Sequence, residues 1–159
     1  HVELGHNFRL TSIAAAIGRV QLERLPGFVD QRRRNAARLT AHLEETDVRT
    51  PYVPAGSTHS YHQYTVRVEN RDEVAERLSE RGIGSGVYYP RCIHEQPAYA
   101  DYEASHPVAE RLTEQVLSLP VHPGLSEEAI DRVGRALRED VPVEPPAAVE
   151  PVAAEVTDD

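Results

Sequence analysis

The spacing of apolar residues predicts a helix close to the N-terminus. Its apolar positions recur every three or four residues, as on one face of an α-helix, and Thr11 precedes them as a residue type that caps helices. The Pro26-Gly27 pair predicts that this helix, which starts at Ser12, ends at about Leu25. Alanines between the apolar positions let a neighbouring element approach closely. These apolar positions are Ile13, Ile17 and Val20.

A second, more polar helix is predicted from about Phe28 to Glu45, followed by a proline- and glycine-marked loop, "TPYVPAGSTHS". The segment "YHQYTVRV" (61–68) alternates and is rich in β-branched and aromatic residues, so it predicts a strand. Its predicted inner face consists of His62, Tyr64, Val66 and Val68.

A helix is predicted directly after this strand. Asn70 is the expected N-cap, Glu73 completes a capping box, and Gly82 marks the C-terminal stop. "GSGVYYP" (84–90) predicts another strand. A strand, a helix and a strand within about thirty residues indicate an α/β layer.

Two further helices complete the pattern. Pro107 is expected to open one that runs to about Leu117, and Ser126 is expected to cap another that runs to about Arg138.

The composition is that of one soluble domain. The chain has 159 residues, of which 40% are hydrophobic and 27% charged. No apolar run approaches the roughly 20 residues of a membrane span, and no signal peptide is recognised, so we expect a cytoplasmic protein with no membrane contact. One cysteine, Cys92, excludes an intrachain disulfide. Because the chain begins with His1, we expect it to be a piece of a longer protein or a truncated copy.

Charge is unevenly distributed. The net charge is −9, and all 17 basic residues are arginine, with no lysine. Residues 140–159 carry six acids, four prolines and no base, so we expect a disordered acidic tail and a body of net charge −3. An acidic body argues against nucleic acid as a partner and against a helix-turn-helix in the first helical region. The run Arg32–Arg34 is interpreted as a solvated face.

Two groups of residues are candidate sites. Asn7 and Arg9 stand just before a helix N-terminus, where an amide and a guanidinium would complete an anion grip; the alternative is an ordinary capped turn. "YYPRCIHEQPAY" (88–99) places Tyr89 and His94 at a strand end, where they would face a polar ligand; the alternative is a loop held by its aromatic residues. The spacings of Cys92 and the nearby histidines match no metal-ligand pattern, so no metal is expected.

Four segments together resemble the C-terminal part of the DegT/StrS-type sugar aminotransferases. They are "LGHNFRLTSIAAAIGRVQLERLPGFVDQRR", "HSYHQYTVRV", "GVYYPRCIHEQPAY" and "VLSLPVHPGLSEEAI", and the resemblance runs from about residue 2 to residue 138. It implies an α/β fold: the C-terminal small domain of an aspartate-aminotransferase-like, type I pyridoxal-phosphate enzyme. The preceding helices would belong against a large domain outside this sequence.

The resemblance also implies roles for individual residues. Asn7, with Arg9 beside it, would contact the phosphate of pyridoxal 5′-phosphate in the other subunit of a homodimer. Tyr89 and His94 would lie near the nucleotide-sugar substrate, and an amino donor would be the second reactant. His6 and Cys92 depart from the family's usual residues, which puts the identity of the substrate in doubt but not the family.

The family's chemistry depends on a lysine that holds the cofactor covalently, and these 159 residues contain none. We therefore expect no catalytic residue here and no activity of this chain alone. The expected divisions are a phosphate arm with linking helices (1–46), an α/β small domain (47–139) and the tail (140–159). The predicted function is that of a segment of an enzyme aminating nucleotide-linked keto-sugars for polysaccharide or amino-sugar biosynthesis. The alternative is a non-catalytic relic or partner subunit that binds an aminotransferase or a sugar nucleotide.

Overall fold

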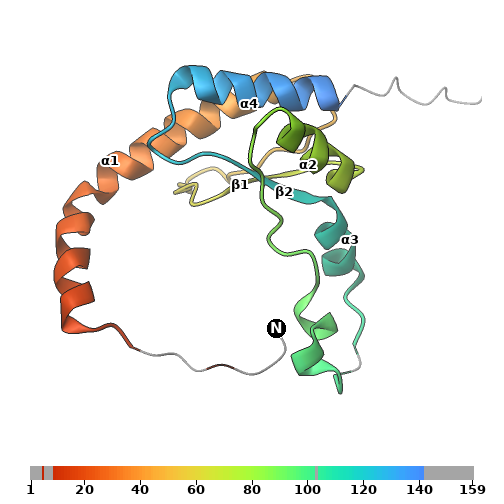
Figure 1. Cartoon of the computed structure of the whole chain (residues 1–159), viewed down its shortest axis with the longest axis horizontal. Coiled ribbons are helices and arrows are strands. Elements are labelled where there is room, and N and C mark those ends of the chain that lie inside the picture. Colours follow the sequence, from red (N-terminus) through yellow and green to blue (C-terminus); the bar gives the residue numbers. More distant parts are fainter. Residues whose placement is uncertain (1–4, 6–8, 103, 142–159) are drawn as a thin grey trace, which may run out of the picture.

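The computed structural model describes residues 5, 9–102 and 104–141. Helices and a small sheet alternate along this part of the chain (Figure 1). The elements are α1 (Ser12–Leu43), β1 (Tyr64–Arg67), α2 (Arg71–Glu80), the 3₁₀ turns η1 (Ile93–Glu95) and η2 (Pro97–Tyr99), α3 (Pro107–Gln115), β2 (Val116–Leu119) and α4 (Glu127–Asp140).

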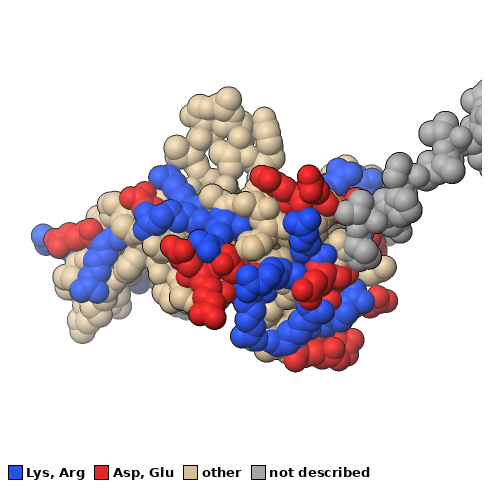
Figure 2. Space-filling view, turned by 90° about the horizontal axis from the view of Figure 1, so that it is seen from above, with Lys and Arg blue, Asp and Glu red and all other residues tan. Residues whose placement is uncertain are grey.

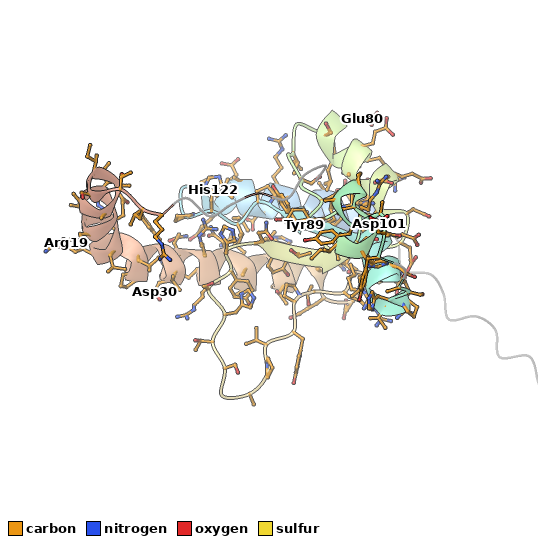
Figure 3. All side chains as sticks on the ribbon, turned by 90° about the horizontal axis from the view of Figure 1, so that it is seen from below. Arg19, Asp30, Glu80, Tyr89, Asp101 and His122 are labelled. Atoms are coloured by element: carbon orange, nitrogen blue, oxygen red, sulfur yellow. The ribbon has the colours of Figure 1, made fainter. Side chains whose placement is uncertain are left out.

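The prediction of two helices separated at Pro26-Gly27 was wrong, because α1 is one continuous helix of 32 residues. Thr11 caps α1 as predicted, because its Oγ1 accepts a hydrogen bond from the amide of Ala14 at 3.3 Å. Pro26 then lies inside the helix. Proline removes one backbone hydrogen bond and strains the preceding turn, which kinks a helix without ending it when the helix continues on both sides. The helix changes direction between Arg19 and Asp30 (Figure 3).

The sheet consists of β1 and β2, which pair antiparallel with Tyr64 opposite Leu119 and Arg67 opposite Val116. Single bridges extend the pairing on both sides, Arg49 with Arg67 and Gly86 with Ser118. The prediction of a strand over 84–90 was therefore wrong, since only Gly86 pairs. The predicted helix from Pro107 ends two residues early, and β2 was not predicted.

The core lies between this sheet and the helices. The alternation predicted for 61–68 is confirmed at Tyr64, Val66 and Val68, which are buried, whereas His62 is exposed and precedes the strand. The second half of α1 supplies Ala36, Leu39 and Leu43 to the core, and α4 supplies Ile130, Val133 and Leu137.

Close packing and charge hold α4 to α1. A Cβ on Gly134 would lie 2.6 Å from atoms of His42, so only glycine permits this approach. Beside it, Arg38 donates two hydrogen bonds to the Asp131 carboxylate, and His42 Nε2 lies 2.8 Å from Asp131 Oδ1. Arg38, with His42, holds the pKa of Asp131 well below its usual range.

The predicted cap and stop residues meet different outcomes. Ser126 caps α4 through the amide of Ala129, and Gly82 has φ +68° directly after α2, both as predicted. Asn70 occupies the N-cap position of α2, but its backbone is left-handed and its side chain makes no capping hydrogen bond. The capping box with Glu73 was therefore wrong. The tail beyond Val141 lies outside the described residues.

Two segments extend from this body on the same side of it. The first half of α1 and the segment 88–106 leave a wide space between them (Figure 1). The opposite, outer face carries arginines and acids in close alternation (Figure 2). The charged face is the solvated one, and the candidate site residues belong to the two extending segments.

Candidate functional site

The predicted phosphate arm lies at the edge of the described structure. Asn7 lies outside the described residues, whereas Arg9 is described and its side chain is exposed. Arg9 precedes Thr11, whose side chain and carbonyl begin the hydrogen bonding of α1. Arg9 is thus a cation beside a helix N-terminus, an arrangement that suits an anion.

Behind this arm, the first half of α1 presents an apolar face to solvent. Ile13 is 77% exposed, Ile17 60% and Val20 55%. Isolated apolar residues on a surface are ordinary, but three on one helical face are typical of a contact surface. We refer to Ile13, Ile17 and Val20 as the α1 apolar stripe.

The segment 88–106 is held to α3 by one carboxylate. Oε1 of Glu110 accepts a hydrogen bond from the amide of His106 at 2.6 Å and lies 3.2 Å from Nε2 of His94. The His106 amide is the main cause that lowers the pKa of Glu110, and His94 adds to it. The carboxylate therefore fixes the stretch 93–106 near both of its ends, at His94 and at His106.

His94 lies inside this anchor. Its side chain is only 12% exposed, and its ring stands edge-on to His106 with centroids 4.9 Å apart. The structure supports the alternative interpretation for this residue, a loop held by its own rings. Contact between His94 and a substrate stays a prediction.

Tyr89 has the opposite environment. It is 66% exposed, and its ring packs edge-on against Tyr88 at 5.9 Å. Tyr89 and His94 line one shallow pocket together, while Tyr89 also faces a larger cavity of about 580 Å³ beside the sheet. We call the larger one the Arg32 cavity; it is lined by Arg32, His62, Gln63, residues 84–86, Tyr88, Tyr89 and residues 118–122.

Arg32 lines this cavity, and its guanidinium is hydrogen-bonded to the backbone of another segment. Its Nη1 donates to the carbonyl oxygens of Tyr61 at 3.2 Å and His62 at 3.1 Å. Arg33 Nε donates to the carbonyl of His59 at 2.9 Å. The interpretation of Arg32–Arg34 as a solvated face holds for Arg34 and for Arg33, whose side chain is 42% exposed, and was wrong for Arg32, which is half-buried. Contacts 26 to 30 residues apart leave no periodic signal in a sequence.

His122 also lines the cavity and was missed, although it belongs to the "LPVHPGL" segment that carried the resemblance. Figure 3 shows Tyr89 and His122 at the middle of the molecule, and both line the Arg32 cavity. Within the described residues, no aspartate or glutamate lines this cavity. Its polar groups are a guanidinium, two imidazoles, hydroxyls and amides.

Cys92 lies within the 88–106 segment and is buried, 6% exposed, and this burial, with the neighbouring Glu95, raises the pKa of its thiol. A protonated thiol is a poor nucleophile. In the described part of the chain, no three histidine, cysteine or acidic side chains are grouped to hold a metal ion. Across the same ranges, no helix has the length and apolar content that a membrane span needs.

The fold and these segments match those of known aminotransferases. Structures of DegT DnrJ EryC1 StrS-type aminotransferases superpose on the chain, among them one from Brucella abortus with TM-score 0.78 and 36% identity, over 84% of this chain and 36% of that one. S. venezuelae DesV, solved with a ketimine intermediate, matches with TM-score 0.76 and 35% identity, over 85% of this chain and 38% of that one. The model of the DegT/DnrJ/EryC1/StrS aminotransferase family matches residues 1–138, and the chain belongs to this family. The predicted fold class, that of type I pyridoxal-phosphate enzymes, is confirmed.

Curated relatives of the chain are also named as sugar aminotransferases. A UDP-N-acetyl-3-dehydro-alpha-D-glucosamine 3-aminotransferase of Acidithiobacillus ferrooxidans is 42% identical over 139 residues, 87% of this chain and 38% of that protein. A UDP-2-acetamido-2-deoxy-3-oxo-D-glucuronate aminotransferase of Pseudomonas aeruginosa is 36% identical, over 86% of this chain and 38% of the relative. The chain thus spans little more than a third of these relatives.

Proposed function

We propose that this chain is the C-terminal segment of a pyridoxal-phosphate-dependent enzyme that transfers an amino group to a nucleotide-linked keto-sugar. The observation that carries the proposal is the family match over residues 1–138, with relatives whose names specify keto-sugar nucleotides. We assign residues 1–46 to the arm and linking helix, 47–139 to the small domain and 140–159 to a tail. A cytoplasmic homodimer is part of the proposal.

The residues present fit one part of the cofactor. Arg9, exposed beside the N-terminus of α1, suits a phosphate, and Asn7 would join it. They do not supply covalent attachment, since the 159 residues contain no lysine. When bound, the cofactor would act as the electron sink of the amino transfer. This chain's own contribution would be to hold the phosphate, and to orient the sugar nucleotide beside Tyr89.

The test is to express the complete reading frame that contains these residues and to assay amination of UDP- and dTDP-linked 3-keto-sugars with L-glutamate. We expect an aminated product, seen by mass spectrometry, and its loss when pyridoxal phosphate is removed. A frame without a lysine-bearing large domain would overturn the proposal in favour of a relic or partner subunit.

The matched control is the 159-residue chain itself. Incubated with pyridoxal phosphate and then borohydride, it should show no stoichiometric internal adduct, because it has no lysine. In the complete enzyme, Asn7→Ala should weaken cofactor retention by ~1–3 kcal/mol, since a hydrogen bond to a charged group is lost. Cofactor affinity equal to that of the wild type would contradict the phosphate-arm assignment.

A further inference from the structure

We propose that the Arg32 cavity binds an anionic group, a phosphoryl or a carboxylate, through Arg32, His62 and His122. The inference deepens the proposed function, on which it rests only for the source of the anion. The site itself is argued from the side chains that line it.

The first argument is the local charge. The chain carries −9, and its outer face alternates acids with arginines, yet the described lining of this cavity holds one arginine, two histidines and no acid. An anion approaching an acidic protein is favoured only where the local field is positive. Of the described residues that line the cavity, Arg32 is the one that carries a formal charge at pH 7 with histidine neutral, and no acidic side chain there opposes it.

The second argument is that Arg32 is fixed before any ligand arrives. Its Nη1 is taken by the carbonyls of Tyr61 and His62, which holds the guanidinium plane in one orientation. Both hydrogen bonds come from Nη1. Within the described structure, Nη2 and Nε of Arg32 make no hydrogen bond, so this edge of the guanidinium is left for a ligand. A planar pair of donors matches the two oxygens of a carboxylate or phosphoryl group.

The third argument is the polar part of the lining. A Cβ on Gly86 would lie 2.6 Å from the Tyr88 ring, so glycine lets that ring pack against the backbone of residue 86. Tyr88, Tyr89 and Ser85, three residues with hydroxyl groups, are among the residues that line the cavity. Ser118 is not counted, because its Oγ already pairs with Thr65 Oγ1 at 2.8 Å.

Two reactants of the proposed enzyme carry such groups, the phosphates of the sugar nucleotide and the carboxylates of the amino donor. Three probes separate them: inorganic pyrophosphate, L-glutamate, and uridine as an uncharged control. Each is titrated into the ¹⁵N-labelled chain, and amide shifts at 84–86 and 118–122 are followed. We expect saturable binding of pyrophosphate or of glutamate, which identifies the source, and no such binding of uridine.

The variants are Arg32→Gln and His122→Gln, with Arg34→Gln as the matched control. Arg34 is on the same helix, but it is exposed and donates to Gln31. We expect Kd for the bound probe to rise about tenfold in Arg32→Gln and His122→Gln and to stay unchanged in Arg34→Gln. His122→Gln guards against loss of binding through misfolding. It removes the imidazole, but the backbone carbonyl that accepts a hydrogen bond from Asn35 stays in place.

No saturable binding, equal binding of uridine, or affinity unaffected by either Arg32→Gln or His122→Gln would overturn the inference. These outcomes are distinct from failure of the proposed function. If the complete enzyme aminates sugars but Arg32→Gln leaves anion affinity unchanged, only the anion site is refuted. If the chain binds the anion but the complete reading frame has no amination activity, only the proposed aminotransferase function is refuted.

Discussion

At the residue scale, Tyr64 shows how burial creates a dependence on pH. Its side chain is fully buried, and its hydroxyl shares a 2.8 Å hydrogen bond with Thr40 Oγ1. Burial raises the pKa of Tyr64 to about 12. Unfolded tyrosine titrates near 10, so the stabilisation is complete below about pH 10 and is lost as pH rises towards 12.

We therefore predict that Tyr64→Phe flattens the alkaline loss of stability. The urea midpoint of the wild type should fall between about pH 10 and pH 11.5, whereas that of the variant should fall much less. At pH 8 the variant should be about 1 kcal/mol less stable, because the hydrogen bond to Thr40 is gone. Tyr52→Phe, at a site 84% exposed, is the control. Equal alkaline slopes in all three proteins would contradict the assignment.

The second residue-scale prediction concerns Glu110, which fixes both ends of segment 93–106. Glu110→Gln removes the charge that His94 and the His106 amide share, so amide exchange in 93–106 should become faster while that in α4 stays unchanged. In the wild type, the same loosening should appear as pH falls below the ordinary glutamate range, because the pKa of Glu110 is lowered and the anchor is lost on protonation.

Glu114→Gln is the matched control for this prediction, since Glu114 is an exposed carboxylate on the same helix. Exchange in 93–106 that responds equally to both substitutions would mean that general charge, not the anchor, holds the segment.

At the element scale, the crossing of α1 and α4 depends on Gly134. We predict that Gly134→Ala destabilises the fold by ~1–3 kcal/mol, because the new methyl group would meet Cβ and Cγ of His42, whose ring is held by Asp131. Gly18→Ala is the control, since nothing lies within 4 Å of its Cβ position and alanine favours a helix by about 0.5–1 kcal/mol. Opposite signs in urea denaturation are expected; a loss in both would contradict the packing argument.

The same scale shows what the sequence could predict. Thr11 and Ser126 were recognisable because capping is local, and the buried alternation of Tyr64, Val66 and Val68 has a fixed period. The continuation of α1 through Pro26 was not, because the flanking turns outweigh one lost hydrogen bond. β2 was missed for another reason: "VLSL" continues the apolar spacing of α3, and only pairing with β1, far away in sequence, makes it a strand.

The candidate site divides along the same line. Arg9 and Tyr89 were predicted from local patterns and a family resemblance, and their roles stay predictions. Arg32, His62 and His122 come from three distant segments and meet only in the folded chain. Within this site, Arg32 could not be distinguished from Arg34 by composition or spacing.

At the scale of the whole molecule, the α1 apolar stripe should control self-association. We predict that the 159-residue chain associates in a concentration-dependent way in sedimentation velocity, because three large apolar side chains on one face lack cover in the described structure. Ile17→Glu should shift it towards monomer. Ala37→Glu, an exposed position further along α1, adds the same charge off the stripe and should not. Identical association of both variants would rule out the stripe.

The continuity of α1 has a mechanical consequence. The helical path from Ser12 to Leu39 is about 40 Å long at 1.5 Å per residue, and the bend makes the end-to-end distance shorter, so a tilt of about 5° at the core end would move the far end by roughly 2–3 Å. The second half of α1 is packed against α4, whereas the first half, which begins close to Arg9, extends away from the core. Pro26 is the elbow of the helix, the point where bending sacrifices no amide hydrogen bond of its own. A small change in packing around Leu39 would therefore move Arg9, just before the helix, by a larger distance.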